Sequence, residues 1–380
     1  MTVDTDTSDL GLDADTRHRL LRWLMLRLWK WCGRIMLLSY CMWLAALLVM
    51  LAAFRWVGEA NPLTAFLLFL PQTLWWLPGV LIWPVLLVFR WREALPLGFV
   101  GLLVFGMGSG WQLRKSQPMS AAEDRAGKSL VILTNNRGQN RGQSLRPFKN
   151  LVEPDVMLFQ ESSARAESYL KDPGYAEFRH GMTQGEFTLI SRFPITQVES
   201  LVYSDAGGKA PYAARFEIDW QGRSVAIYTV HLPSPRETLL SMRGGAFLYG
   251  FPVPVDWWRR RRKEVGAFWL RHLAIAENLA KRLEAEALPY WVAGDFNASH
   301  LGRIHHLLLQ QVGDAHRDAG VGFGFTFPGE TRNPLSFGDA WLRLDQVFAS
   351  RQWRIKACWT ESERRSQHRA VAAEGSLELP

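Results

Sequence analysis

The chain has 380 residues, of which 48% are hydrophobic and 21% are charged, and its formal net charge is +8. This composition excludes a disordered or collagen-like chain, and the length is enough for two or three domains. The 3 cysteines exclude a disulfide-rich scaffold and a cysteine-rich zinc module.

The N-terminal segment, residues 1–34, is basic and amphipathic. It carries six Lys or Arg residues from Arg17 to Arg34, interleaved with Leu and Trp. This pattern predicts a segment that lies in the membrane interface ahead of a spanning helix.

Three stretches without a charged residue follow, at 35–54, 60–89 and 94–113. A helix needs about 20 apolar residues to cross a bilayer. The region 35–113 therefore predicts three transmembrane helices, at about 35–54, 66–89 and 94–112. The middle helix contains three prolines, which predict a kink or a late start. Tryptophans near the ends of the spans favour the headgroup region.

Positive charge predicts the orientation of these helices. The positive-inside rule assigns the basic N-terminal segment, together with Arg90 and Arg92, to the cytoplasmic side. Three crossings then place the chain after residue 113 on the extracytoplasmic side. We therefore expect an integral protein of a bacterial-type inner or plasma membrane.

Residues 114–380 are predicted to form one catalytic domain. Short β-like runs occur at 129–134, 156–159, 187–191, 213–218, 225–230, 290–293 and 344–348. Helix-like stretches occur at 144–152 and 264–287. Strands with intervening helices indicate an α/β or α+β domain.

Polar residues lie at strand ends or in the loops of this domain. They are Asn136, Glu161, His231, Asp295, Asn297, Asp345 and His368. Convergent polar groups at strand ends are how such scaffolds build active sites. A hard cation such as Mg²⁺ takes carboxylate and phosphate oxygens, so Glu161 is a candidate metal ligand. The predicted chemistry is metal-assisted hydrolysis of a phosphate ester.

The sequence resembles a known family. Residues 129–372 are similar to the endonuclease/exonuclease/phosphatase superfamily of metal-dependent phosphoesterases. The resemblance rests on Leu-Thr-Asn-Asn136, Phe-Gln-Glu161, Ile190-Ser-Arg-Phe-Pro, Val-His231-Leu, Gly-Asp295-Phe-Asn297, Thr326-Phe, Arg-Leu-Asp345 and Ser-Gln-His368. It implies an α+β fold in which two packed β-sheets are flanked by helices, with the site at one rim.

The resemblance also implies roles for these residues. Glu161 is a direct ligand of Mg²⁺ or Mn²⁺, and Asn136 sits at the metal. His231 contacts the scissile phosphate, which Asn297 helps to hold. Asp295 orients or deprotonates the attacking water. Asp345 pairs with His368, which stabilises the transition state or acts as a general acid or base.

One departure from the family pattern concerns the last motif, where the family has Ser-Asp-His and this chain has Ser-Gln367-His. Gln is a poorer ligand for a hard cation, so weaker metal binding, a preference for Mn²⁺ or a changed substrate would follow. The main hypothesis is a membrane-anchored phosphodiesterase that acts on nucleic acid or on a phospholipid headgroup. The alternatives are a phosphomonoesterase on the same fold and a catalytically silent binding domain.

An insertion-like stretch, residues 236–264, combines aromatic residues with five consecutive basic residues. Its candidate substrate-binding residues are Trp257, Trp258, Arg259 and Arg260. Three interpretations remain open: contact with nucleic acid, contact with anionic lipid at the bilayer, and a solvated helix start. The sequence leaves the oligomeric state open.

Overall fold

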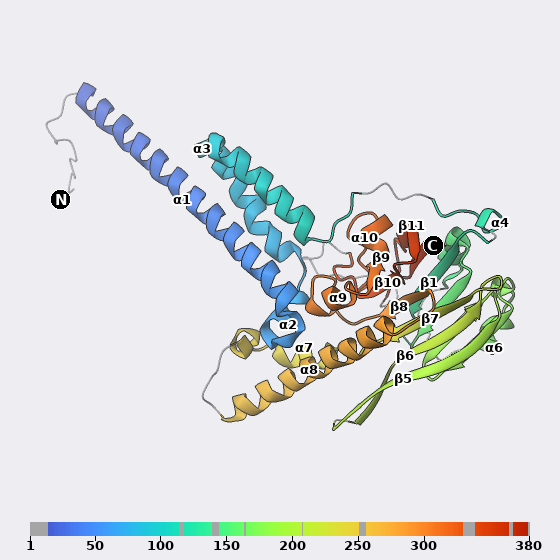
Figure 1. Ribbon diagram of the computed structural model, residues 1–380. Coiled ribbons are helices and arrows are strands. Elements are labelled where there is room, and N and C mark those ends of the chain that lie inside the picture. The colour runs from blue at the N-terminus through green and yellow to red at the C-terminus, as the bar shows by residue number, and fades with distance from the viewer. Residues whose placement is uncertain are drawn as a thin grey trace, which may run out of the picture. The chain divides into compact units, whose positions relative to one another are not determined.

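The computed structural model describes residues 14–113, 118–125, 127–138, 144–162, 165–206, 208–250, 256–329, 339–364 and 368–378 (Figure 1). The chain divides into two compact units. The first, here the helical unit, contains Met1–Val49 and Trp75–Phe105. The second, here the sheet unit, contains Met50–Leu74 and Gly106–Pro380. The sheet unit therefore includes a segment that the sequence assigned to the transmembrane region.

Two helices are long and apolar enough to cross a membrane, rather than the three separate helices expected. The first is α1 (Ala14–Trp56), which runs through 43 residues and joins the basic N-terminal segment to the first apolar stretch. The basic segment and the first apolar stretch are therefore one continuous helix. The second is α3 (Thr73–Gly108), and the late start that the prolines predicted is confirmed.

A break at Arg90 divides α3 into two arms. Its backbone is non-helical there, with φ −148° and ψ 56°. Trp83 Nε1 donates a hydrogen bond to the carbonyl oxygen of Ala94 (2.9 Å), and a Cβ on Gly98 would lie 2.3 Å from the Trp83 ring. In a straight helix, residues 83 and 98 would be about 22 Å apart. The arms therefore fold back on each other, as Figure 1 shows.

The sheet unit contains two six-stranded sheets. In the first, the strand order is β11 (Trp353–Thr360), β12 (Val371–Leu377), β1 (Leu130–Asn136), β2 (Val156–Gln160), β4 (Phe187–Ser191) and β3 (His180–Gln184). In the second, the order is β5 (Ile195–Asp205), β6 (Gly208–Asp219), β7 (Ser224–His231), β8 (Tyr290–Asp295), β10 (Asp345–Ser350) and β9 (Val312–Asp314). Among the described strands, only β1–β2 and β7–β8 pair in parallel.

Apolar side chains from both sheets form a shared core. Ile132 and Leu158 of the first sheet belong to the same buried cluster as Phe216 and Trp291 of the second. Two mixed sheets with flanking helices confirm the predicted fold class. Each of the seven predicted strands corresponds to a strand of the structure.

Helices cover the outer faces and link the strands. The short helices are η1 (Gly58–Ala60), α2 (Pro62–Leu68), α4 (Ala122–Arg125), α5 (Arg146–Val152), α6 (Ala166–Leu170), η2 (Pro173–Tyr175), α7 (Arg236–Met242), η3 (Ala246–Gly250), α9 (Arg303–Leu308) and α10 (Ala315–Ala319). The long helix α8 (Asp256–Glu284) starts eight residues earlier than expected, and therefore contains the basic run.

The segment between α1 and α3 packs within the sheet unit. Ala65 of α2 belongs to a buried cluster with Met242 of α7 and Trp269 of α8. Glu59 of η1 is fully buried, and its Oε2 accepts a hydrogen bond from the N–H of Ile304 in α9 (3.1 Å). This segment is therefore part of the core of the sheet unit.

Candidate active site

The parallel strand pairs bring polar residues to one rim of the sandwich. Asn136 ends β1, and Glu161 directly follows β2. In the second sheet, His231 at the end of β7 is the register partner of Asp295 at the end of β8. Asp295 is in turn the partner of Asp345 at the start of β10. Strand register therefore places these side chains at one level.

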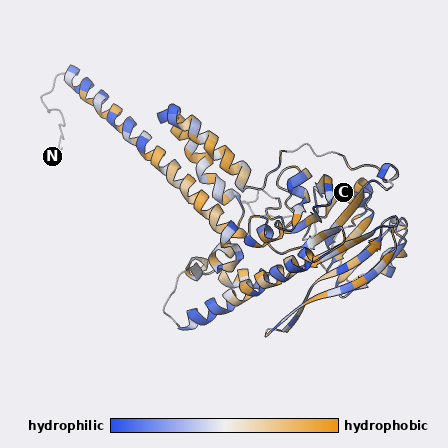
Figure 2. Cartoon of the chain, in the orientation of Figure 1, coloured by the Kyte–Doolittle hydropathy of each residue, from blue (hydrophilic) through white to orange (hydrophobic). Residues whose placement is uncertain are grey.

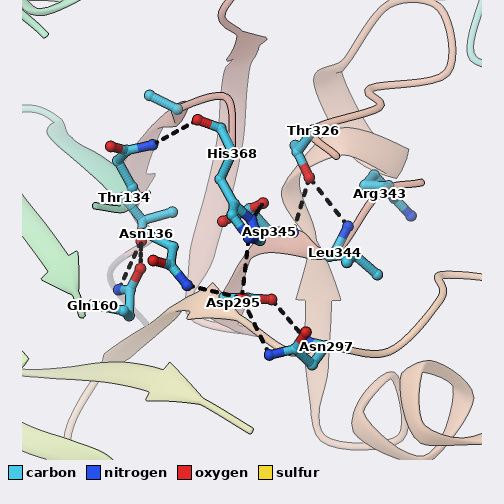
Figure 3. Close-up of polar contacts among 12 residues, drawn as sticks. Thr134, Asn136, Gln160, Asp295, Asn297, Thr326, Arg343, Leu344, Asp345 and His368 are labelled. Carbon is cyan, nitrogen blue, oxygen red and sulfur yellow. Dashed lines mark hydrogen bonds and ion pairs between the residues drawn. The ribbon is translucent and has the colours of Figure 1, made fainter. Parts of the chain in front are cut away.

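Asn136 links the two sheets at this rim (Figure 3). Its Nδ2 donates to Glu161 Oε1 (3.1 Å) and to Asp295 Oδ2 (3.0 Å). Its Oδ1 accepts from the N–H of Gly138 (2.9 Å). Asn136 here orients the two carboxylates, and its Oδ1 uses one of its two lone pairs for the bond from Gly138.

A buried carboxylate–imidazole pair lies beside this link. Asp345 Oδ2 is 2.9 Å from His368 Nδ1, and His368 Nε2 is 3.7 Å from Asp295 Oδ2. Burial lowers the pKa of His368, but the carboxylates of Asp345 and Asp295 outweigh that effect and raise it to about 9. Thr326 Oγ1 accepts from the N–H of Asp345 (3.1 Å) and fixes the start of β10. The imidazole is thus held protonated and oriented at neutral pH.

His231 lies between two acidic side chains. Its Nε2 is 3.4 Å from Glu161 Oε1, and its Nδ1 is 3.1 Å from Glu186 Oε1. Burial lowers the pKa of His231, but its hydrogen bond to the Glu186 carboxylate and the charge of Asp295 raise it above its usual value. The sequence did not predict Glu186 as a site residue, because it lies in the turn between β3 and β4, where an acidic residue does not by itself indicate a functional site.

Asn297 orients Asp295 from the following loop. Its backbone N–H donates to Asp295 Oδ1 (2.9 Å), and its Nδ2 donates to Asp295 Oδ2 (3.2 Å) and to the carbonyl oxygen of Leu232 (2.9 Å). Its φ of 45° lies in the left-handed region, which Asn tolerates better than most residues. Through these bonds Asn297 orients Asp295.

The charges at this rim suit a divalent cation. In the described part of the chain, the ion pairs of Glu161, Glu186, Asp295 and Asp345 involve only His231 and His368, with no Lys or Arg. Four carboxylates against two imidazoles leave a net negative site made of oxygen donors. Mg²⁺ and Mn²⁺ both accept such donors.

Two places can hold that cation. Ligand atoms of Asp295, Asp345 and His368 lie within 4.8 Å of one another. Asp345 and His368 already bond to each other, and an imidazole must lose its proton before it binds a metal. Glu161 is better suited, because a third of its side-chain surface is exposed and its carboxylate faces the same rim.

The four basic and aromatic candidates lie elsewhere, at the start of α8. Trp258 is buried against Tyr249, with ring centroids 4.6 Å apart, so its ring has no surface for a substrate. Trp257, Arg259 and Arg260 are exposed. Burial lowers the pKa of His272 in α8, but this residue is close enough to Asp295 for the charge of Asp295 to oppose that effect. Arg260 lies about 18 Å before His272 along the helix axis. The structure therefore does not bring them to the rim. Gln367 lies outside the described residues.

A model of the endonuclease/exonuclease/phosphatase family matches residues 132–368. Truncated TDP2 from Caenorhabditis elegans is 16% identical over 65% of this chain and 98% of its own, with a TM-score of 0.44. TDP2 from D. rerio, complexed with a single-strand DNA product, is 13% identical over 65% and 99%, with a TM-score of 0.45.

An endonuclease/exonuclease/phosphatase from Beutenbergia cavernae is 13% identical over 66% of this chain and 72% of its own, with a TM-score of 0.43. No curated protein matches the chain. At these identities and TM-scores, the assignment of the family rests on the family model.

Proposed function

Because the chain belongs to the endonuclease/exonuclease/phosphatase family, we propose that it is a membrane-anchored phosphodiesterase that depends on a divalent metal ion. The observation that carries this proposal is the convergence of Glu161, His231, Asp295 and the Asp345–His368 pair at one rim. Carboxylates that bind a metal, a base for water and protonated imidazoles for phosphate oxygens are the groups that phosphate-ester hydrolysis needs.

In the proposed reaction, water attacks phosphorus and the bond from phosphorus to the ester oxygen breaks. Asp295, oriented by Asn136 and Asn297, accepts the proton of the attacking water. The leaving oxygen takes up a proton, so one water molecule is added across the broken bond. A metal ion held by Glu161 would neutralise phosphate charge. Protonated His368, fixed by Asp345, donates to a phosphate oxygen on which charge develops.

The membrane part of the proposal rests on α1 and on the two arms of α3. The arms have about 17 and 18 residues, so each is about 26 Å long, close to the hydrocarbon thickness of about 30 Å. With α1 they make three crossings. The excess of Lys and Arg before the first crossing places the sheet unit on the extracytoplasmic side.

The test uses the full chain in detergent with Mg²⁺, Mn²⁺ or a chelator. Four substrates separate the activities: bis(4-nitrophenyl) phosphate, 4-nitrophenyl phosphate, supercoiled plasmid and phospholipid vesicles. We expect metal-dependent hydrolysis of the diester and a loss of at least about 100-fold in the Asp295→Ala variant. The matched control is Asp205→Ala, which removes a carboxylate that pairs with Arg271 at the surface.

Each other outcome has a definite meaning. Faster cleavage of the monoester would establish a phosphomonoesterase instead. Plasmid nicking identifies a nuclease, and headgroup release from vesicles identifies a phospholipid-type substrate. No hydrolysis of any substrate with either metal would overturn the proposal in favour of a silent binding domain.

A further inference from the structure

A pocket outside the candidate active site lies between the start of α2 and the first turns of α8. Its volume is about 440 Å³, within the range of small-molecule sites. Its lining consists of Ala60, Asn61, Pro62, Arg259, Arg262, Lys263 and Gly266. All of these residues belong to the sheet unit. The lining therefore contains three cations and no carboxylate.

The helical repeat divides the basic run of α8 between two faces. Arg259, Arg262 and Lys263 are spaced three and four residues apart and face this pocket. Arg260 and Arg261 face a separate surface hollow, where Glu237 and Glu264 supply compensating negative charge. Figure 2 shows the hydrophilic start of α8. Among the described lining residues, the hollow beside Arg260 and Arg261 contains carboxylates and the pocket beside Arg259, Arg262 and Lys263 does not.

This arrangement is unfavourable for the helix by itself. Like charges at these spacings repel, and cations in the first turns oppose the helix dipole. Arg259 makes only a 3.9 Å contact with Asp256, at the limit of an ion pair, and both side chains are largely exposed. A bound anion would relieve both costs.

The opposite wall of the pocket, residues 60–62, lies in the chain between the end of α1 and the start of α3. Ala60 follows Trp56, the last residue of α1, by four residues, which span at most about 14 Å. Pro62 begins α2, whose last residue, Leu68, precedes the start of α3 by five residues. If α1 crosses a bilayer, this wall therefore lies within about 14 Å of the end of that helix.

We propose that this pocket binds the phosphate group of an anionic phospholipid and thereby seats the sheet unit on the membrane surface. The proposal rests on the membrane anchoring proposed above, but not on catalysis. None of the described lining residues is aromatic and able to stack on a nucleic-acid base, and Trp257 lies on the other face of α8. Lipid therefore fits the lining better than single-stranded nucleic acid does.

The test is the thermal stability of the full chain in a neutral detergent with added dioctanoyl phosphatidylglycerol, which is anionic, or dioctanoyl phosphatidylcholine, which has no net charge. A ligand that binds only the folded state raises Tm. We expect phosphatidylglycerol to raise Tm by about 2–6 °C more than phosphatidylcholine does. The double variant Arg259→Gln/Lys263→Gln should lose this difference. Arg262 is left unchanged because its Nε donates to the carbonyl oxygen of Tyr249 (3.1 Å).

The matched control is Arg260→Gln/Arg261→Gln, which removes the same charge from the other face of α8 and should keep the full shift. The shift should also persist in Asp295→Ala, so it does not depend on hydrolysis. Equal loss in both double variants would indicate non-specific attraction and overturn the proposal. An equal rise in Tm with inorganic phosphate would also overturn it. So would a rise in Tm with a single-stranded oligonucleotide, if Arg259→Gln/Lys263→Gln abolished that rise and left the rise with phosphatidylglycerol unchanged. Alkaline carbonate extraction separately tests the anchoring.

Discussion

A buried carboxyl group, that of Glu59, joins the segment between α1 and α3 to the start of α9. Burial raises its pKa from 4.5 to about 7, against the opposing hydrogen bond from Ile304 and the charge of Arg303. The folded state therefore binds more protons than the unfolded state between these two values. Stability must fall as pH rises from 4.5 through 7.

We predict that Glu59→Gln removes this pH dependence. Gln keeps an oxygen that can accept from Ile304 and carries no charge, so at pH 8 the variant should be more stable by up to about 3 kcal/mol. The measurement is the Tm of the full chain in detergent from pH 5 to pH 8. Glu167→Gln, at an exposed position of α6, is the control. Parallel curves of Tm against pH for wild type and Glu59→Gln would contradict the prediction.

Most of the rim was predictable at the level of single residues. Glu161, His231, Asp295 and Asp345 stand where apolar strands end or begin, and strand register then makes them neighbours. Glu186 was not predictable, because its contact with His231 joins residues 45 positions apart, from different sheets. Local sequence patterns do not indicate such a long-range contact.

At the scale of elements, Gly294 controls how closely β8 approaches β7. Its φ is 149°, and a Cβ there would lie 2.0 Å from the carbonyl oxygen of Val230. The obstacle is backbone, so no side-chain rotation can relieve the clash. The glycine thereby sets the position of Asp295, the next residue along the chain.

We predict that Gly294→Ala costs about 3 kcal/mol and lowers hydrolytic activity by displacing Asp295. Thermal unfolding of the full chain checks the first effect and the diester assay the second. Gly244→Ala should change neither, because nothing lies within 4 Å of a Cβ at that glycine. An unchanged Tm in Gly294→Ala would mean that the two strands separate without cost.

The strands that the sequence missed have weak patterns for physical reasons. β3 and β5 are edge strands and are only partly buried, so they lack a continuous apolar run. β12 is buried but reads Val-Ala-Ala-Glu-Gly, which has low β propensity. The reversal at Arg90, by contrast, lies between the spans predicted at 66–89 and 94–112.

At the scale of the whole molecule, the sheet unit needs the segment between α1 and α3. Ala65 is fully buried beside Trp269, and Trp341 Nε1 donates to the carbonyl oxygen of Phe69 (3.1 Å). A chain that starts at residue 114 lacks this cover. It would leave part of an apolar cluster open to water, and large exposed apolar patches promote association.

We therefore predict that a fragment of residues 114–380 aggregates or binds a hydrophobic dye, whereas the full chain in detergent remains monodisperse. Size-exclusion chromatography and dye fluorescence compare the two directly. The full chain carrying Ala65→Asp should share the defect, because it introduces a charge into the same cluster. A monodisperse fragment that unfolds cooperatively would show that the segment is dispensable.

The order of the elements in the chain also determines how long this segment waits for its packing partner during synthesis. α2 is made about 190 residues before the start of α8, so at about 5–20 residues per second it waits on the order of 10–40 s for its partner. By then all residues of the helical unit exist, since that unit ends at Phe105 and, among the described residues, the first strand begins at Leu130. The helices α1 and α3 are thus complete before α8, the later packing partner of α2, has been made. The cluster that α2 shares with α8 therefore cannot form until α8 has been synthesised.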